Sequence, residues 1–120
     1  MSVFDSSVII DFFQGLPATV KTVNAYASHS LRTHPIVVCE VIAGAHDARE
    51  MAQLIKGMRP FMQVEVIADD WWHAQELFRT FYLRHGTGWQ DCLIRATCRC
   101  VHEEVLTIND RHFSIFPGLK

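Results

Sequence analysis

The hydrophobic and polar positions of the chain form two kinds of segment, which alternate along the sequence. Short apolar runs are followed by longer segments in which apolar residues recur every three or four positions. Short runs bounded by polar residues favour strands, and a period near 3.6 favours amphipathic helices. The predicted strands span residues 3–4, 31–34, 64–67 and 105–108, and the predicted helices span 8–13, 18–30, 37–45, 48–58, 71–83 and 90–101, with a turn or short helix at 109–113.

Strands separated by helices throughout predict a parallel sheet with helices on both faces. The expected class is therefore α/β, with three layers and a central sheet of four to five short strands. At 120 residues the chain has the size of one domain, and we expect a single domain over residues 1–120.

Composition excludes several classes of protein. Hydrophobic residues make up 49% of the chain and charged residues 20%, which excludes a disordered chain. No apolar run reaches the roughly 18 residues of a membrane span, and the N-terminus lacks the features of a signal peptide. We therefore expect a cytoplasmic protein with no membrane partner.

The formal net charge of -2 argues mildly against a nucleic-acid partner, because phosphate binding usually leaves a basic surface. A cluster of acids around a divalent cation would change this picture. Setting four such acids aside leaves 9 acidic residues against 11 Lys and Arg.

Several polar residues are expected at one edge of the sheet, because ligands of such sheets bind beyond the carboxyl ends of the strands. Asp5 follows the first predicted strand, and Asn109 and Asp110 follow the last. Glu40 is the only charge in PIVVCEVIAGA, so we expect its carboxylate to be at least partly buried and to need a partner. Asp91 begins a predicted helix and lies on the same stripe as its inward residues, which are Ile94, Thr97, Cys98 and Val101.

Each of these acids also has an ordinary structural interpretation. Asp5 could cap the next helix, Glu40 could form a buried ion pair, Asp91 could favour a helix start, and Asp110 could serve a turn. Taken together, the four acids would converge at one end of the sheet. Clusters of oxygen ligands suit Mg²⁺ or Mn²⁺, and two such ions can activate water for phosphodiester cleavage.

Four segments in this order resemble the successive motifs of PIN domains, and more narrowly of the VapC-type ribonuclease toxins of toxin-antitoxin pairs. They are VFDSSVIIDFFQG, VVCEVIAGA, GWQDCLIRATC and VLTINDRHFSIFPGL, and together they cover essentially the whole chain. The resemblance implies a PIN-like fold and an endoribonuclease that depends on Mg²⁺ or Mn²⁺ and cleaves structured RNA such as tRNA or rRNA. It also implies a homodimer and inhibition by a cognate VapB-type antitoxin.

The resemblance also assigns roles to individual residues. The acids that match Asp5, Glu40 and Asp91 hold metal in the family. Our hypothesis for Glu40 is that it either ligates the metal or orients the water as a base. Ser7 matches a small hydroxyl residue that supports the first acid. Thr107 and Asn109 match a T-x-N signature beside the site.

One position departs from the family pattern. Family members often carry the last acid directly before the Phe that follows T-x-N, and this chain has His112 there. Asp110 is the candidate for the missing catalytic and metal-binding carboxylate. The departure leaves an alternative function open, that of a catalytically weakened PIN-like module that binds a protein or RNA partner.

Two further groups of residues have alternative interpretations. The candidates for contacts with RNA phosphates are Arg95, Arg99, Arg111 and His112, although an ordinary solvated face explains most such residues. The aromatic stretch that begins at Trp71 and Trp72 is interpreted first as core packing, and second as a surface for a second copy or an antitoxin.

Overall fold

The computed structural model describes residues 2–25, 31–100 and 104–106, which form six helices and four strands. The strands are β1 (Ser2–Phe4), β2 (Arg32–Thr33), β3 (Met62–Gln63) and β4 (Glu104–Leu106). The helices are α1 (Ser6–Phe13), α2 (Pro17–Ala25), α3 (Pro35–Ala43), α4 (Ala48–Met58), α5 (Ala68–His85) and α6 (Trp89–Cys100).

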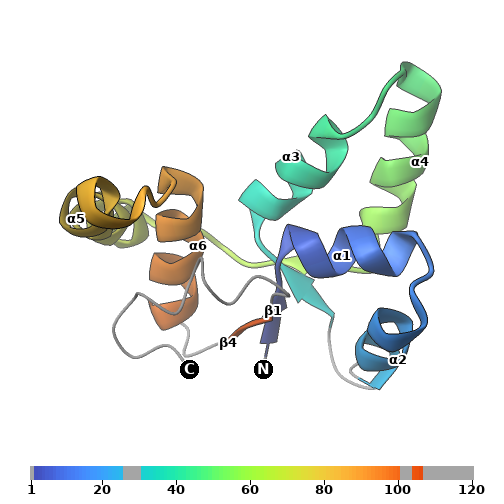
Figure 1. Ribbon diagram of the computed structural model, residues 1–120, viewed down its shortest axis with the longest axis horizontal. Helices are drawn as coiled ribbons and strands as arrows, with labels where there is room; N and C mark the ends of the chain where they lie inside the picture. The colour runs from blue at the N-terminus through green and yellow to red at the C-terminus, as the bar shows by residue number, and fades with distance from the viewer. Residues whose placement is uncertain (1, 26–30, 101–103, 107–120) are drawn as a thin grey trace.

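The four strands form one parallel sheet in the order β3-β2-β1-β4. Helices α5 and α6 lie on one side of the strands and α1 and α2 on the other, while α3 and α4 extend from the sheet (Figure 1). The predicted α/β class with a parallel sheet is confirmed. Because all strands are parallel, their carboxyl ends meet at one edge.

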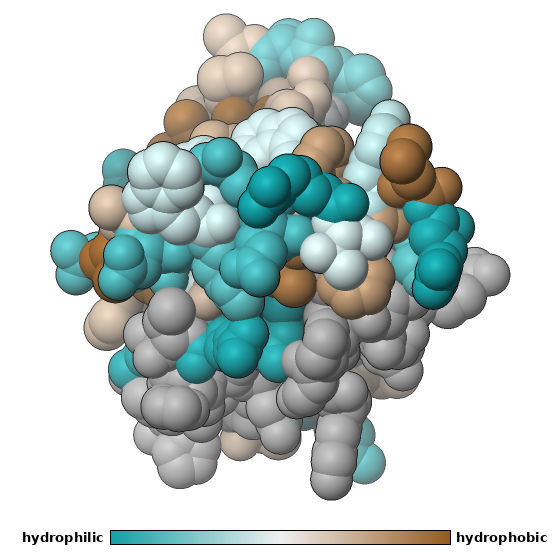
Figure 2. Space-filling model, turned by 90° about the vertical axis from the view of Figure 1, so that its left-hand side faces the viewer, coloured by the Kyte–Doolittle hydropathy of each residue, from teal (hydrophilic) through white to brown (hydrophobic). Residues whose placement is uncertain are grey.

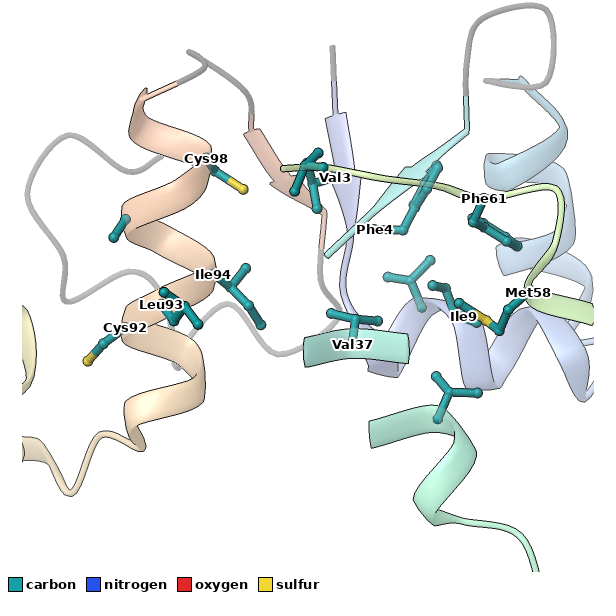
Figure 3. Packing of buried hydrophobic residues seen from close by; sticks show 14 of the residues in the cluster. Val3, Phe4, Ile9, Val37, Met58, Phe61, Cys92, Leu93, Ile94 and Cys98 are labelled. Atoms are coloured by element: carbon teal, nitrogen blue, oxygen red, sulfur yellow. The ribbon is translucent and has the colours of Figure 1, made fainter. Parts of the chain in front are cut away.

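The core fills both sides of β1, because successive side chains of a strand point to opposite faces. Ile94 and Cys98 point from α6 toward Val3, and Phe4 lies with Phe61 on the side of α1 (Figure 3). The rings of Phe4 and Phe61 meet edge to face, with their centroids 6.1 Å apart. This packing holds the end of β1 between α6 and α1.

The strand predicted at residues 64–67 is wrong. The strand there is β3, two residues earlier, and Val64 contributes only one further backbone hydrogen bond, to the carbonyl oxygen of Thr33 at 2.9 Å. Its neighbour β2 ends at Thr33 and the chain turns into α3 at Pro35, so residues after Val64 have no strand to pair with.

Helix α5 begins earlier and ends later than predicted, at Ala68 instead of residue 71 and at His85 instead of residue 83. Asp70 acts in its first turn, where its Oδ2 accepts a hydrogen bond from the backbone N–H of Ile67 at 2.9 Å. Gly86 ends the helix in the left-handed region, with φ 64°, a conformation that glycine adopts without steric cost.

Candidate active site

Asp5 is the first residue after β1 and occupies the N-cap position of α1. Its side chain makes no capping hydrogen bond, so the interpretation of Asp5 as a helix-capping carboxylate is wrong. The hydroxyl of Ser7 donates to Asp5 Oδ2 at 3.2 Å instead. Asp5 is 7% exposed, and its buried carboxylate lies at the carboxyl edge of the sheet.

Glu40 lies on α3, and the charges of the other two acids affect its pKa. Burial, then the charge of Asp5 and then that of Asp91 raise the pKa of Glu40 from 4.5 to about 7. Coulomb repulsion of this kind requires the carboxylates to lie near one another. Three acids that are far apart in the sequence therefore meet in one region of the molecule.

The environment of Glu40 differs from the prediction in one respect. We expected at least partial burial of this residue, but Glu40 belongs to the exposed residues of α3, while Val37 and Val41 carry the buried stripe. Part of the carboxyl group is nonetheless removed from water, because burial is the largest cause of its raised pKa. Among the described residues, Glu40 forms no salt bridge, which argues against the buried ion pair.

Asp91 lies in the first turn of α6 and is half-buried. The predicted inward stripe of this helix is confirmed for Ile94, Thr97 and Cys98, which are all fully buried. Burial and the charge of Asp91 raise the pKa of Cys92 to about 11. Because α6 leads into β4 of the parallel sheet, its N-terminus and Asp91 lie at the same edge of the sheet as Asp5.

The three acids fit a divalent cation in chemistry and in charge. Carboxylate oxygens are the ligands that Mg²⁺ and Mn²⁺ prefer, and the charges of Asp5 and Asp91 add to the effect of burial in raising the pKa of Glu40. In the part of the chain that the structure describes, no group of three or more His, Cys, Asp or Glu side chains is arranged so that it could hold a metal ion. Mg²⁺ usually keeps several water ligands, so one or two carboxylates are a sufficient protein contribution.

The remaining predicted site residues divide into two groups. Arg95 is 7% exposed, so it is poorly placed for the phosphate contact we predicted, whereas Arg99 is exposed and its guanidinium donates to His73 Nε2 at 2.8 Å. The others lie outside the described residues, and they are Thr107, Asn109, Asp110, Arg111 and His112.

Sequence reasoning missed two buried polar residues. Thr33 and His34 are fully buried, and their hydrogen bonds reach β1, the start of α3 and α6. The available signal was this polar pair directly before the proline that begins α3. Polar residues at such a position either cap the helix or hold neighbouring elements together.

The aromatic stretch of α5 is largely exposed, so its interpretation as core packing is wrong for the tryptophans. Trp72 is 70% exposed, and Trp71 stacks on Trp89 of α6 with ring centroids 6.3 Å apart. These two rings line a cleft of about 260 Å³ together with Phe78. The face of the molecule that carries α5 mixes hydrophilic with hydrophobic residues (Figure 2).

Fold and site together define an α/β protein with an acidic centre at the carboxyl edge of a parallel sheet. A family model described as PIN domain matches residues 2–119, and the chain belongs to the PIN domain family. A search of curated protein sequences found no match. Within the described residues, we find no helix that combines the length and apolar character of a membrane span.

Two solved structures share the fold. A toxin-antitoxin complex from Klebsiella pneumoniae contains a chain that is 21% identical, with a TM-score of 0.81 over 100% of this chain and 96% of that one. VapBC2 from Rickettsia felis, bound to a DNA fragment from its promoter, contains a chain that is 15% identical, with a TM-score of 0.80 over 98% of this chain and 94% of that one.

Proposed function

We propose that this PIN-family chain is a divalent-metal-dependent endoribonuclease and the toxin of a type II toxin-antitoxin pair. The observation that carries the proposal is the placement of Asp5, Glu40 and Asp91 at the carboxyl edge of the sheet, where burial first, and then repulsion by Asp5 and Asp91, raises the pKa of Glu40 to about 7. Such repulsion costs free energy unless a cation compensates it. A metal-dependent nuclease needs carboxylates to hold its cation, because the cation compensates the negative charge of the phosphodiester.

The carboxylates have distinct proposed roles. Asp5 and Asp91 hold Mg²⁺ or Mn²⁺, and Ser7 keeps the Asp5 carboxylate in one orientation through its hydrogen bond. When bound, the cation supplies Lewis-acid activation of water and stabilises negative charge on the phosphate. Glu40 either joins the ligands or accepts the proton of the attacking water, since a positioned carboxylate can act as a general base.

Residues at the C-terminal end of the sequence complete the proposed site. Asp110 is the proposed fourth carboxylate, and Thr107 and Asn109 support it. Arg99, Arg111 and His112 are the proposed contacts with RNA phosphates. Structured RNA such as tRNA or rRNA is the proposed substrate.

The proposed partners are a cognate VapB-type antitoxin and a second copy of the chain. Two solved complexes of similar fold are named as toxin-antitoxin assemblies. The exposed apolar side chains of α5 also support a protein partner, since large exposed apolar residues are enriched in interfaces. They include Trp71, Trp72, Tyr82 and Leu83.

The test is cleavage of tRNA, rRNA and single-stranded DNA with Mg²⁺ or Mn²⁺ and with EDTA. The wild type should cleave RNA only with metal, and Asp91→Asn and Glu40→Gln should lose at least about a hundredfold in rate. Glu76→Gln, an exposed glutamate of α5, is the matched control and should cleave normally. Cleavage in EDTA, or in both site variants, contradicts the mechanism. Binding of Mn²⁺ and RNA without cleavage would favour the weakened binding module.

A further inference from the structure

One buried imidazole connects the helices that carry two of the acids. His34 is fully buried at the N-cap of α3, where its Nδ1 accepts a hydrogen bond from the backbone N–H of Ile36 at 3.0 Å. Its Nε2 lies 3.0 Å from the hydroxyl oxygen of Thr97 on α6. Thr97 in turn donates to the carbonyl oxygen of Leu93 at 2.9 Å.

These partners determine the tautomer of His34. Nδ1 accepts a hydrogen bond from a backbone N–H, so it carries no proton. The Thr97 hydroxyl already donates its proton to the carbonyl oxygen of Leu93. The Nε2 proton of a neutral imidazole is therefore donated to Thr97. Burial lowers the pKa of His34 to about 4, against an opposing effect of Asp70, so the ring is neutral at physiological pH.

The end of β1, which leads into Asp5, is also connected to this hydrogen-bonded group. The hydroxyl of Thr33, the residue before His34, donates to the carbonyl oxygen of Phe4 at 3.0 Å. Phe4 immediately precedes Asp5. The dipeptide Thr33-His34 thus connects the end of β1, the start of α3 and the middle of α6.

Glu40 and Asp91 lie at equal sequence distances from the two residues of the His34–Thr97 hydrogen bond. Glu40 lies six residues after His34, and Asp91 lies six residues before Thr97. Six helical residues span about 9 Å, so both acids stand about equally far along their helices from the hydrogen bond that joins them. In the described part of the chain, α3 and α6 share little direct contact. The hydrogen bond of the imidazole to Thr97 is thus a direct, buried connection between these two helices.

We propose that His34 is a positioning residue, which sets the separation of Glu40 and Asp91 by joining the start of α3 to Thr97 of α6. The inference rests on the proposed function, since the separation matters when both acids act on one cation. The positions of metal ligands depend on the residues that hold them in place. Loss of one such supporting residue typically weakens metal binding by tenfold or more.

Two variants remove the hydrogen bond between His34 and Thr97 and keep an acceptor for the cap of α3. His34→Asn keeps an acceptor near the position of Nδ1, so it can cap α3, but it is too short to reach Thr97. Thr97→Val removes the same bond from the other side at nearly equal volume. Thr97→Ser keeps the hydroxyl and is the conservative variant that should retain function.

The experiment measures the Mn²⁺ dissociation constant of each folded variant by calorimetry, together with urea denaturation and RNA cleavage. His34→Asn and Thr97→Val should each raise that constant about tenfold, and the double variant should raise it no further, because one bond is lost in every case. Thr97→Ser should behave as the wild type. Val23→Ala, which opens the core at α2, should lose folding stability while keeping the wild-type constant.

The possible failures are distinguishable. Wild-type binding of Mn²⁺ by folded His34→Asn and Thr97→Val overturns this inference and leaves the nuclease intact, as do additive losses in the double variant. If His34→Asn does not fold, the comparison of Thr97→Val with Thr97→Ser decides alone. A wild type that binds Mn²⁺ without cleaving RNA overturns the proposed function only, and one that does neither overturns both.

Discussion

Replacing Glu40 with glutamine should stabilise the metal-free protein at alkaline pH and leave it unchanged at acid pH. The pKa of Glu40 is raised from 4.5 to about 7 on folding. Below pH 4.5 the carboxyl is neutral in both the folded and the unfolded chain, so it contributes no difference. As pH rises from 4.5 to 7 the unfolded chain releases this proton first, and folding stability falls. Glutamine does not ionise and avoids the loss.

The magnitude follows from the size of the shift and the exposure of the side chain. A fully buried carboxyl whose pKa moves from 4.5 to about 7 would lose about 3 kcal/mol of folding free energy once ionised. Glu40 is exposed, and solvent screens its repulsion with Asp5 and Asp91. We therefore expect Glu40→Gln to be more stable than the wild type by about 1 kcal/mol at pH 8.

The assay is urea denaturation in EDTA at pH 4 and at pH 8, with Glu76→Gln as the control for removing an exposed glutamate from a helix. The stability gain of Glu40→Gln should appear only at pH 8. Saturating Mn²⁺ should reverse the order at pH 8, because the wild type gains about 3 kcal/mol at a hundred times its dissociation constant and the variant gains less. Equal stability of wild type and Glu40→Gln at pH 8 in EDTA would refute the reasoning.

Three further perturbations test individual contacts of the site and its surroundings. Asp91→Asn should lower the pKa of Glu40 toward 4.5, as followed by carbon NMR of its carboxyl group, and an unchanged titration would show that the two charges do not interact. Ser7→Ala removes the hydrogen bond to Asp5, so calorimetry should find Mn²⁺ bound about tenfold more weakly with little loss of folding stability; equal affinity would mean that Ser7 does not orient the acid. Asp47→Ala removes the side-chain cap of α4, which should cost about 1 kcal/mol in urea denaturation while leaving Mn²⁺ affinity at the wild-type value.

Local pattern predicted most of the helices because their apolar stripes and stop signals lie within a few residues of one another. The inward residues Ile94, Thr97 and Cys98 of α6 are an example. The strand at 64–67 was predicted wrongly because a strand needs a partner, and β2 is only two residues long. Strand β2 is short because α3 begins at Pro35, which is far in the sequence from residues 64–67.

The exposure of individual residues was also beyond local pattern. Trp71 and Trp72 look like core residues by composition, but among the described elements α5 packs mainly against α6, and both tryptophans are exposed. Glu40 looks buried among its apolar neighbours, but Val37 and Val41 occupy the inward side of α3. Burial depends on which neighbours a helix meets, and a single segment does not contain that information.

By itself the sequence determined the α/β class, the alternating order of elements and four candidate acids, of which Asp5, Glu40 and Asp91 match acids of PIN domains. Only the tertiary structure decided that Asp5, Glu40 and Asp91 repel one another and that His34 joins two of their helices. The physical reason is one of range. Hydrophobic periodicity acts between residues a few positions apart, whereas charge repulsion and buried hydrogen bonds act through space between residues that folding alone brings together.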